Sequence, residues 1–584
     1  MIKFFLIRHS LGIVFAIIAG IICIAPQLLL INAAGSDYQG IPFFDINDET
    51  YYMARMHDIL DGHGWVSSPF IYEYKTQVPL MYPLVEYLYA IPAFIFGIGL
   101  QNIIVFGRFL FPTILFLLVY LLLFRLAEDG TRASKLNAIV GALFVVLGYD
   151  IIDYRTAVPF LLGKMQLTPF LIWTRTVNPV TGAILIFSLL LLLWSLIQKP
   201  RRYSFVMPGI VFGLMIGYFF SWSISFAIIG SLTLIFIFQK KYDVVKQLLL
   251  ILPVWAVVSA PYWYNAVRAI GSPAGEKTAL RNALFLTHVP VINKVLVATI
   301  TVFLGFFIYT YIKKRKAQEK MEFWWWFLFA LLLSGVTVFS QQIITGRTIW
   351  PHHYVQYTIP FSIVVGMIVL YKVVRPQFFK VWASIISIIA ITSLYYGIVA
   401  AQSYRFLVND IRDNQRYASV LAWLNDNAEK DCVVLVKEEI QEKLTRLIPS
   451  FTSCNVYSAQ WILFGVVPDD ERIHHTVMVH LRLQGIPAER AEQYLTTHAG
   501  WLRNYFYRDW HDFLVQDENI LWLVDVRKKI VEDYRAFLKK DFSTELEKYK
   551  LDYIIADGQL DTSAHRSLSL LKNVEIVDDF HIYQ

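Results

Sequence analysis

Long apolar runs dominate the chain. A helix that crosses a membrane needs roughly 20 mostly apolar residues, because the hydrocarbon core is about 30 Å thick and a helix rises about 1.5 Å per residue. Their number predicts a polytopic α-helical membrane protein with about 11 transmembrane helices. The runs are residues 11–31, 103–124, 136–147, 180–196, 205–219, 224–238, 248–260, 295–312, 323–339, 355–371 and 381–400.

Composition supports the same class of protein. Hydrophobic residues make up 56% of the 584 residues and charged residues only 17%, whereas globular chains carry roughly 25% charged residues. This excludes a disordered, collagenous or disulfide-scaffold chain. With 3 cysteines and no CxxC motif, a structural zinc site is also excluded. The net charge of +7 is interpreted as loop topology and not as a nucleic-acid surface.

Basic residues orient the spans. Lys3, Arg8 and His9 precede the first run, which predicts a cytoplasmic N-terminus and an uncleaved signal anchor. A cleaved signal peptide is the alternative, with small residues at 33–35, but the run exceeds the usual roughly 7–15 residues. Five basic loops then fall on the cytoplasmic side: residues 125–135, 199–202, 240–246, 313–316 and 372–380.

The apolar segment 79–100 is an exception. Counting it as a span would place all five basic loops outside, so it is predicted to be a juxtamembrane or re-entrant helix. The sizeable outer loops are then residues 32–102, 148–179, 261–294 and 340–354. The expected location is the plasma membrane, with several passes and an extracytoplasmic C-terminus.

The chain divides into a membrane domain at 1–400 and a soluble, extracytoplasmic α/β domain at 401–584. Cys432 and Cys454 either pair in an oxidising exterior or remain free thiols. The domain's expected strands are 432–436, 455–459, 553–556 and 574–577, and its expected helices are 411–427, 488–495 and 531–540.

The first outer loop concentrates acidic residues next to the membrane. Asp45, Asp48 and Glu49 lie within five residues, ahead of a predicted amphipathic helix. On that helix Asp48, Tyr52 and Arg55 share one face at i, i+4 and i+7. A carboxylate near a cation stays ionised, as a general base or metal ligand requires. Alternatively, Asp48 only caps a helix that begins at Glu49.

A second acidic pair, Asp150 and Asp153, ends the third span, with Arg155 close behind. Carboxylates from separate loops hold Mg²⁺ or Mn²⁺ in many proteins. A simple ion pair with Arg155 is the alternative.

The short outer loop at 340–354 carries Arg347, His352 and His353. The planar guanidinium suits phosphate oxygens, while interfacial His side chains can also be anchors. Other outer cations oppose the positive-inside bias and suggest an anionic ligand, with lipid headgroup contact or salt bridges as the alternative. They are Lys75, Lys164, Arg175, Arg268, Lys277 and Arg281.

The common nucleotide and hydrolase motifs are missing. The sequence contains no Walker A loop, no GxGxxG and no GxSxG. Acidic and basic residues are also scarce in the middles of the spans, where ion-coupled transporters place them. The polar chemistry is therefore expected at one face of the membrane.

The first span is followed by a long outer loop, which opens with NDETYY (47–52) and has Arg55 beyond it. A Pro-rich helix with QVPLMYPL (77–84) comes next. In this order, these elements resemble the GT-C superfamily of membrane glycosyltransferases. NDETYY is similar to the first-loop motif of single-subunit oligosaccharyltransferases. QVPLMYPL is nearer to the aminoarabinose and protein O-mannosyl transferases. The oligosaccharyltransferase Trp-Trp-Asp signature is missing, because the tryptophans at 324–326 lie in a span and precede Phe327. The resemblance therefore favours transfer of a monosaccharide.

The resemblance implies roles for particular residues. Asp48 corresponds to the catalytic carboxylate, with Glu49 or Asp45 as substitutes, and Arg347 to the arginine on the lipid phosphate. Asp150 and Asp153 correspond to second-loop acids, which complete a divalent-cation site with Asp48 in metal-using branches; no other cofactor is expected. The remaining expected substrate-binding residues are His352, His353, Tyr52, Arg55, Lys75 and Arg175.

The expected reaction moves a sugar from a polyprenyl-phosphate donor to an extracytoplasmic glycan, lipid or protein, with inversion. Phosphate is already an acidic leaving group, so one base and charge stabilisation suffice, unlike hydrolytic glycosidases. Membrane lipid is an expected partner and nucleic acid is not. A transporter or lipid flippase is one alternative, but it predicts broken or ionisable midplane helices. A non-enzymatic membrane receptor is the other.

Overall fold

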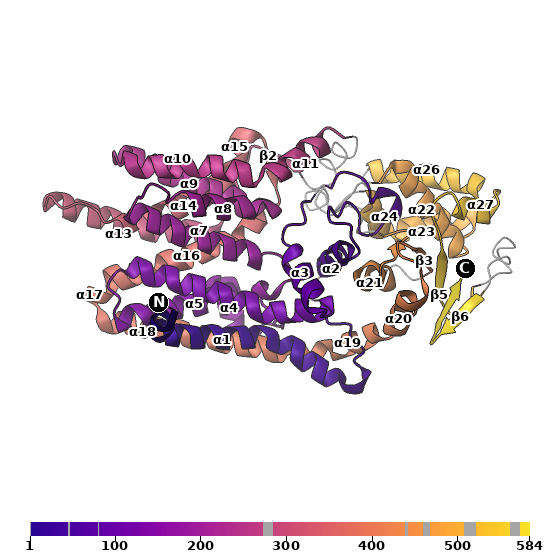
Figure 1. The fold of residues 1–584 in the computed structure, drawn as a ribbon, viewed down its shortest axis with the longest axis horizontal. Coiled ribbons are helices and arrows are strands. Elements are labelled where there is room, and N and C mark those ends of the chain that lie inside the picture. Colours follow the sequence, from indigo (N-terminus) through magenta and orange to yellow (C-terminus); the bar gives the residue numbers. More distant parts are fainter. Residues whose placement is uncertain are drawn as a thin grey trace. The chain divides into compact units, whose positions relative to one another are not determined.

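The computed structural model describes residues 2–44, 47–79, 81–272, 284–437, 442–459, 468–506, 521–560 and 573–584. The chain forms two compact units (Figure 1). Unit 1 comprises Met1–Gly35, Asn102–Pro261 and Phe285–Asn409. Unit 2 comprises Ser36–Gln101, Tyr262–Leu284 and Asp410–Gln584. The sequence suggested a boundary near residue 400, whereas the structure groups the first outer loop with the C-terminal segment.

Unit 1 is helical, and each of the predicted spans is a helix. Thr131 and Asn293 cap two of these helices by accepting hydrogen bonds from the backbone N–H groups of Ser134 and Leu296. The helices are α1 (Ile2–Ala34), α4 (Leu100–Ala127), α5 (Arg132–Val146), α7 (Val180–Gln198), α8 (Val206–Leu214), α9 (Phe219–Phe238), α10 (Tyr242–Val258), α13 (Lys294–Lys316), α14 (Phe323–Ser340), α16 (Val355–Val369) and α18 (Phe379–Gln402).

The protein is a multi-pass membrane protein. Within the described residues, eight helices are long and apolar enough to cross a membrane, or up to nine if the pair α10 and α11 (Ala260–Ile270), bent by 64°, counts as one span. Helix α5 has 15 residues and α8 has 9. Both are shorter than the roughly 20 residues that a straight span requires. The predicted total of 11 spans therefore stays a prediction.

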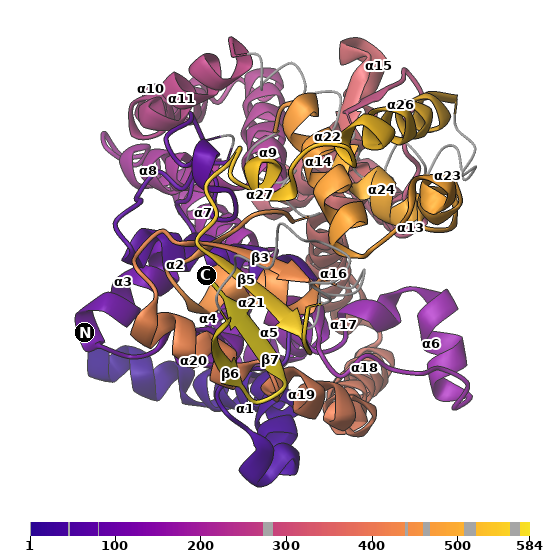
Figure 2. The same cartoon turned by 90° about the vertical axis from the view of Figure 1, so that its right-hand side faces the viewer.

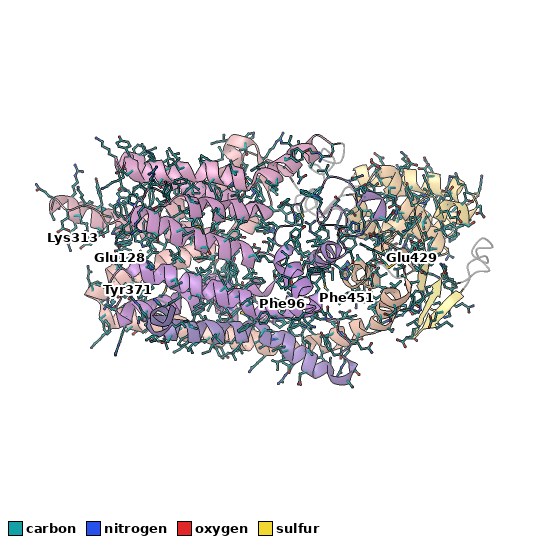
Figure 3. All side chains as sticks on the ribbon, in the orientation of Figure 1. Phe96, Glu128, Lys313, Tyr371, Glu429 and Phe451 are labelled. Carbon is teal, nitrogen blue, oxygen red and sulfur yellow. A yellow bond between two sulfur atoms is a disulfide. The ribbon has the colours of Figure 1, made fainter. Side chains whose placement is uncertain are left out.

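The basic loops gather at one end of unit 1, where Figure 3 shows Glu128, Lys313 and Tyr371. Since oppositely directed neighbouring helices bring alternate loops to the same end, this arrangement agrees with the predicted threading. The compartment that this end faces stays a prediction. The linking contacts are Lys135 Nζ to Arg8 O (2.8 Å), Gln198 Nε2 to Glu128 Oε1 (3.1 Å), Lys372 Nζ to Glu128 Oε2 (2.9 Å), Lys314 Nζ to Glu322 Oε1 (2.8 Å), and Lys372 and Lys241 over the rings of Trp324 and Phe323.

Unit 2 contains a five-stranded mixed sheet in the order β4-β3-β5-β7-β6 (Figure 2). Strands β4 and β5 run parallel to β3, and β7 runs antiparallel to both β5 and β6. The four predicted strands are present, and a fifth, β7, follows β6 through the turn at Asp578, whose φ is 52°. The strands are β3 (Val433–Lys437), β4 (Asn455–Val456), β5 (Tyr553–Asp557), β6 (Asn573–Val577) and β7 (Phe580–Tyr583).

Helices surround this sheet. The prediction of 411–427 corresponds to two helices, α19 and α20, and the other two predictions correspond to α23 and α26 with shifted ends. The helices are α19 (Val408–Gln415), α20 (Ala418–Asn427), α21 (Lys443–Phe451), α22 (Asp470–Leu483), α23 (Ala488–Thr497), α24 (Ala499–Phe506), α26 (Leu521–Phe537) and α27 (Phe542–Leu546).

The two faces of the sheet bury two separate cores, because side chains alternate along a strand. Val433 and Ile554 face the core formed with α22, α23, α24 and α26. Val434 and Ile555 face a core that includes Tyr51 and residues of α20 and α21. The first outer loop therefore completes one face of the sheet, which explains its place in unit 2.

A disulfide joins Cys432 to Cys454, with Cα atoms 4.5 Å apart. The first of the two alternatives drawn from the sequence is therefore the one found. The bond links the residue before β3 to the residue before β4, so it anchors the edge of the sheet. Val456 N–H also donates to Phe70 O at 2.8 Å, which attaches the first outer loop to this edge.

Candidate active site

The first outer loop enters helix α2 (Asn47–Leu60) at its acidic end. Because the helix begins at Asn47, Asp48 lies inside the first turn, where the helix dipole favours a negative charge. Asp48 is partly exposed, whereas Glu49 is 1% exposed. A general base must contact its substrate, so burial favours Asp48 over Glu49. Asp45 lies outside the described residues.

Arg55, for which substrate binding stays a prediction, is an interior residue. It is fully buried, and its Nε lies 2.5 Å from Glu86 Oε1. Its other nitrogens donate to Met81 O at 3.0 Å and to Val66 O at 3.4 Å. Burial alone would lower the pKa of Arg55, but Glu86 and Tyr51 leave it raised. The side chain thus ties α2 to α3 (Tyr87–Phe96). Tyr52 from the same predicted face is half-buried.

Lys75 is likewise neutralised by carboxylates. Its Nζ lies 2.9 Å from Asp58 Oδ1 and 2.6 Å from Asp431 Oδ1, and its side chain is 7% exposed. Burial raises the pKa of Asp58 despite Lys75, whereas Lys75 and His63 outweigh burial and lower the pKa of Asp431. These ion pairs connect the first outer loop with the residue beside Cys432. Lys75 therefore holds unit 2 together, which is the salt-bridge alternative considered for outer cations.

The second acidic pair lies in unit 1, and its members have different partners. Asp153 caps α6 (Tyr154–Leu161), and Arg155 contacts both of its carboxylate oxygens, which lowers the pKa of Asp153. Asp150 accepts a hydrogen bond from Tyr396 Oη at 3.1 Å, and burial raises its pKa.

Of the two carboxylates, only Asp153 is engaged by a cation from the described part of the chain. Asp153 takes the ion-pair alternative, since both of its oxygens are engaged. Across the described ranges, no group of three or more His, Cys, Asp or Glu side chains is arranged to hold a metal. Asp48 belongs to unit 2 and the pair to unit 1, so a metal site shared by them stays a prediction.

The late outer loop presents Arg347 to solvent. Arg347 begins β2 (Arg347–Ile349), and its carbonyl oxygen accepts hydrogen bonds from Gln341 Nε2 and Thr345 Oγ1, both at 2.9 Å. Gly346 before it has φ +65°, and an added Cβ would lie 3.1 Å from the His288 ring. Glycine is therefore required at this turn. The turn fixes the backbone of Arg347 and leaves its guanidinium exposed.

An aromatic cluster follows Arg347 in the same loop. His353 Nδ1 lies 2.8 Å from Tyr218 Oη, and its ring stacks on Phe220 with centroids 4.7 Å apart. His352 is exposed and stacks on Trp350. The rings of His352 and His353 lie 4.5 Å apart and both lie near the ring of Trp350, so the two histidines belong to one cluster, in which His352 is the more accessible.

Three helices of unit 1 begin at this cluster. α7, α9 and α16 start at Val180, Phe219 and Val355, and the rings of Tyr218 and Tyr357 lie 6.5 Å apart between them. An added Cβ at Gly182 would lie 2.3 Å from Tyr357 Oη, so the helix starts approach closely. Helix N-termini carry partial positive charge, although at α16 the N–H of Val355 already donates to the carbonyl oxygens of His352 and His353. This end of unit 1 is therefore suited to an anion.

Two residues that the structure places in specific contacts, Tyr218 and Arg108, were not singled out from the sequence. Tyr218 was missed because nothing in its local pattern shows that it meets His353, 135 residues later. Arg108 in α4 is 2% exposed and lies over the ring of Phe170 at 4.5 Å. An arginine inside an apolar run is the signal that could have identified it.

The expected site residues thus divide between the two units. Asp48, Glu49, Tyr52, Arg55 and Lys75 lie in unit 2. Arg347, His352, His353, Arg175, Asp150 and Asp153 lie in unit 1. Arg175 is half-buried before α7, Lys164 and Arg268 are exposed, and Lys277 and Arg281 lie outside the described residues.

No family model matches the chain, and no curated protein sequence matches it. Solved structures with a similar fold include the archaeal oligosaccharyltransferase AglB from Archaeoglobus fulgidus, in complex with an inhibitory peptide and a dolichol-phosphate. It is 13% identical, with a TM-score of 0.45, and the match covers 94% of this chain and 69% of AglB. ArnT from Cupriavidus metallidurans, bound to undecaprenyl phosphate, is 12% identical, with a TM-score of 0.41, and the match covers 100% of this chain and 98% of ArnT. At these identities and TM-scores, the two matches transfer neither a superfamily nor a residue role to this chain.

Proposed function

We propose that the protein is a membrane glycosyltransferase that moves a sugar from a polyprenyl-phosphate donor to an extracytoplasmic acceptor. The observation that carries the proposal is the end of unit 1 where the starts of α7, α9 and α16 meet the histidines, which lie in the same loop as the exposed Arg347. A lipid-linked phosphate needs such donors at a membrane surface. The second part of the proposal is that Asp48 acts as the base, and it is supported by the resemblance of the NDETYY motif to the first loop of GT-C enzymes.

In the proposed reaction, the Asp48 carboxylate accepts the proton of an acceptor hydroxyl. The hydroxyl oxygen attacks the anomeric carbon from the side opposite the phosphate, so the configuration inverts. The bond between the anomeric carbon and the phosphate oxygen breaks, and polyprenyl phosphate leaves with both bonding electrons. Arg347 stabilises the charge that develops on that phosphate. A general acid is unnecessary because phosphate is a good leaving group.

The test measures release of polyprenyl phosphate from a panel of radiolabelled polyprenyl-phosphate sugars, with membrane extract as acceptor and a parallel EDTA series. Asp48→Asn should lower turnover by about 10²–10⁴-fold, as expected for loss of a general base. Arg347→Gln should lower it by about 10²–10³-fold. The EDTA series decides whether a metal takes part.

Matched variants make this test specific. Arg268→Gln removes another exposed outer cation and should leave turnover unchanged. Glu49→Gln distinguishes the neighbouring carboxylate from Asp48. If no donor is turned over, or if Asp48→Asn and Arg347→Gln match the parent, the proposal is wrong and the transporter alternative gains support.

A further inference from the structure

Unit 2 contains a cavity of about 440 Å³ that the proposed reaction does not use. Its walls come from three segments that are far apart in the sequence. Helix α2 contributes Met53, His57 and Leu60, residues 93–101 form the end of α3 and the start of α4, and α21 contributes Ser450 and Phe451. The volume is in the range of small-molecule sites.

The walls are unsuited to a polar ligand. Only three of the lining side chains are polar, namely His57, Gln101 and Ser450. Ser450 Oγ already lies 2.8 Å from the carbonyl oxygens of Thr50 and Arg446, and His57 Nδ1 lies 2.9 Å from Asp61. A sugar or peptide would leave most of its polar groups without partners, which is unfavourable. Hydrocarbon meets no such penalty.

The cavity opens among exposed apolar side chains. Phe94 and Ile98 both line it, yet they are 78% and 43% exposed. Their neighbours Ile95 and Phe96 are 65% and 70% exposed, and Figure 3 shows Phe96 and Phe451 on adjoining parts of unit 2. An exposed apolar patch of this kind marks contact with a membrane or a partner.

The position of this patch along the protein sequence favours contact with a membrane. Leu100 and Gln101, both in the cavity wall, are the first two residues of α4, a helix of spanning length. A spanning helix enters the hydrocarbon layer within its first turns. The mouth of the cavity is therefore expected at the level of the bilayer surface, where lipid chains surround it.

We propose that this cavity holds one hydrocarbon chain of a membrane lipid, either acyl or isoprenoid. The chain enters between Phe94 and Ile98 and lies against Leu60 and Phe451, while its headgroup stays at the mouth. The inference concerns binding in unit 2 alone and stands without the proposed sugar transfer.

The test uses the full chain in two sets of phosphatidylethanolamine and phosphatidylglycerol nanodiscs. One set contains a phospholipid with a diazirine on its acyl chain, and the other contains a diazirine-bearing polyprenyl phosphate. After irradiation, mass spectrometry maps the labelled residues. Leu60 is the decisive position because it lies in the wall that α2 contributes and is only partly exposed, whereas Met53 is 1% exposed and presents almost no surface even to the cavity. Label on Leu60 and Phe451 in either set supports the proposal, and the set identifies the kind of chain.

Variants then narrow the cavity. Ala93→Phe fills it from α3, and Gly99→Met fills it from an exposed position where an added Cβ meets only the flexible end of Gln101. Both should lower labelling of Leu60 at least fivefold with unchanged gel-filtration profiles. Ile91→Phe is the control, because Ile91 lies on α3, is 50% exposed and is not in the wall.

Label confined to Phe94 and Ile98, or label on Leu60 that both narrowing variants leave intact, would overturn the proposal. No sugar transfer is measured in this experiment. Failure of the proposed function therefore leaves its result unchanged, and the reverse also holds.

Discussion

Replacing Arg55 separates a structural role from a substrate-binding role. Arg55 is fully buried, and its guanidinium is 2.5 Å from the carboxylate of Glu86, which is itself 3% exposed. Arg55→Met leaves that carboxylate buried without its cation. Breaking a buried ion pair from one side destabilises a protein by about 3–5 kcal/mol. At roughly 2–4 °C per kcal/mol, the apparent melting temperature should fall by about 10 °C.

A double variant tests the same reasoning from the opposite direction. Arg55→Met with Glu86→Leu removes both charges and keeps apolar volume, so most of the lost stability should return. The bonds from Arg55 to Met81 O and Val66 O are lost in both variants, which sets the part that does not return.

The assay is thermal unfolding of the detergent-purified chain, followed by tryptophan fluorescence, together with binding of polyprenyl phosphate to the folded protein. Arg347→Met is the control, because loss of an exposed cation should move the melting temperature by only about 1–2 °C. If Arg55→Met keeps the parental melting temperature and loses only lipid binding, Arg55 contacts substrate and the reasoning from burial is wrong.

Two further predictions concern unit 2. The Cys432–Cys454 disulfide closes a loop over 22 residues and should contribute about 3 kcal/mol to stability, so the double Ala variant should melt about 8 °C lower. The denatured parent should show one free thiol before reduction and three after it. Three free thiols before reduction would contradict the disulfide. Burial lowers the pKa of His475 and His480 to about 4. The unfolded state therefore binds more protons than the folded state below about pH 6.5, and stability falls as the pH drops from about 6.5 to about 4. At pH 5 the expected loss is about 2 kcal/mol per histidine. Urea unfolding at pH 7 and pH 5 measures this slope, and the parental slope in the His475→Gln, His480→Gln double variant would show that other groups cause it.

The spans and most strands were predictable because their signals are local. A spanning helix satisfies its own backbone in lipid, so an apolar run suffices to locate it. β3 and β5 are short apolar runs because their side chains are buried on both faces of the sheet. β7 was missed because only four residues, Phe580–Tyr583, form it, and the evidence for it is pairing with β5 and β6. Helices α5 and α8 are short, which an apolar run does not reveal.

The interior ion pairs were beyond sequence reasoning, since their partners are separated along the chain. Lys75 meets Asp431 across 356 residues, and Arg55 meets Glu86 across 31. Before the fold is known, a buried Arg and a ligand-binding Arg have the same appearance in a loop rich in acids. The prediction that Asp48, Tyr52 and Arg55 share one face of a helix rests on helical periodicity. Periodicity indicates the direction in which a side chain points, but not which residues or ligands that side chain contacts.

The partners found in the structure narrow the choice of phosphate-binding cation. Outer cations opposed the positive-inside bias, and an anionic ligand was one explanation for all of them. Arg55, Lys75 and Arg155 each have a carboxylate partner within 3.0 Å, so their charges are already balanced. For Arg347, as for the exposed Lys164 and Arg268, no ion pair is found among the described residues, and only Arg347 follows a constrained turn in the loop that also carries the histidines. A charge that the fold holds outward and does not neutralise is available to a ligand, which makes Arg347 the strongest candidate for the donor phosphate.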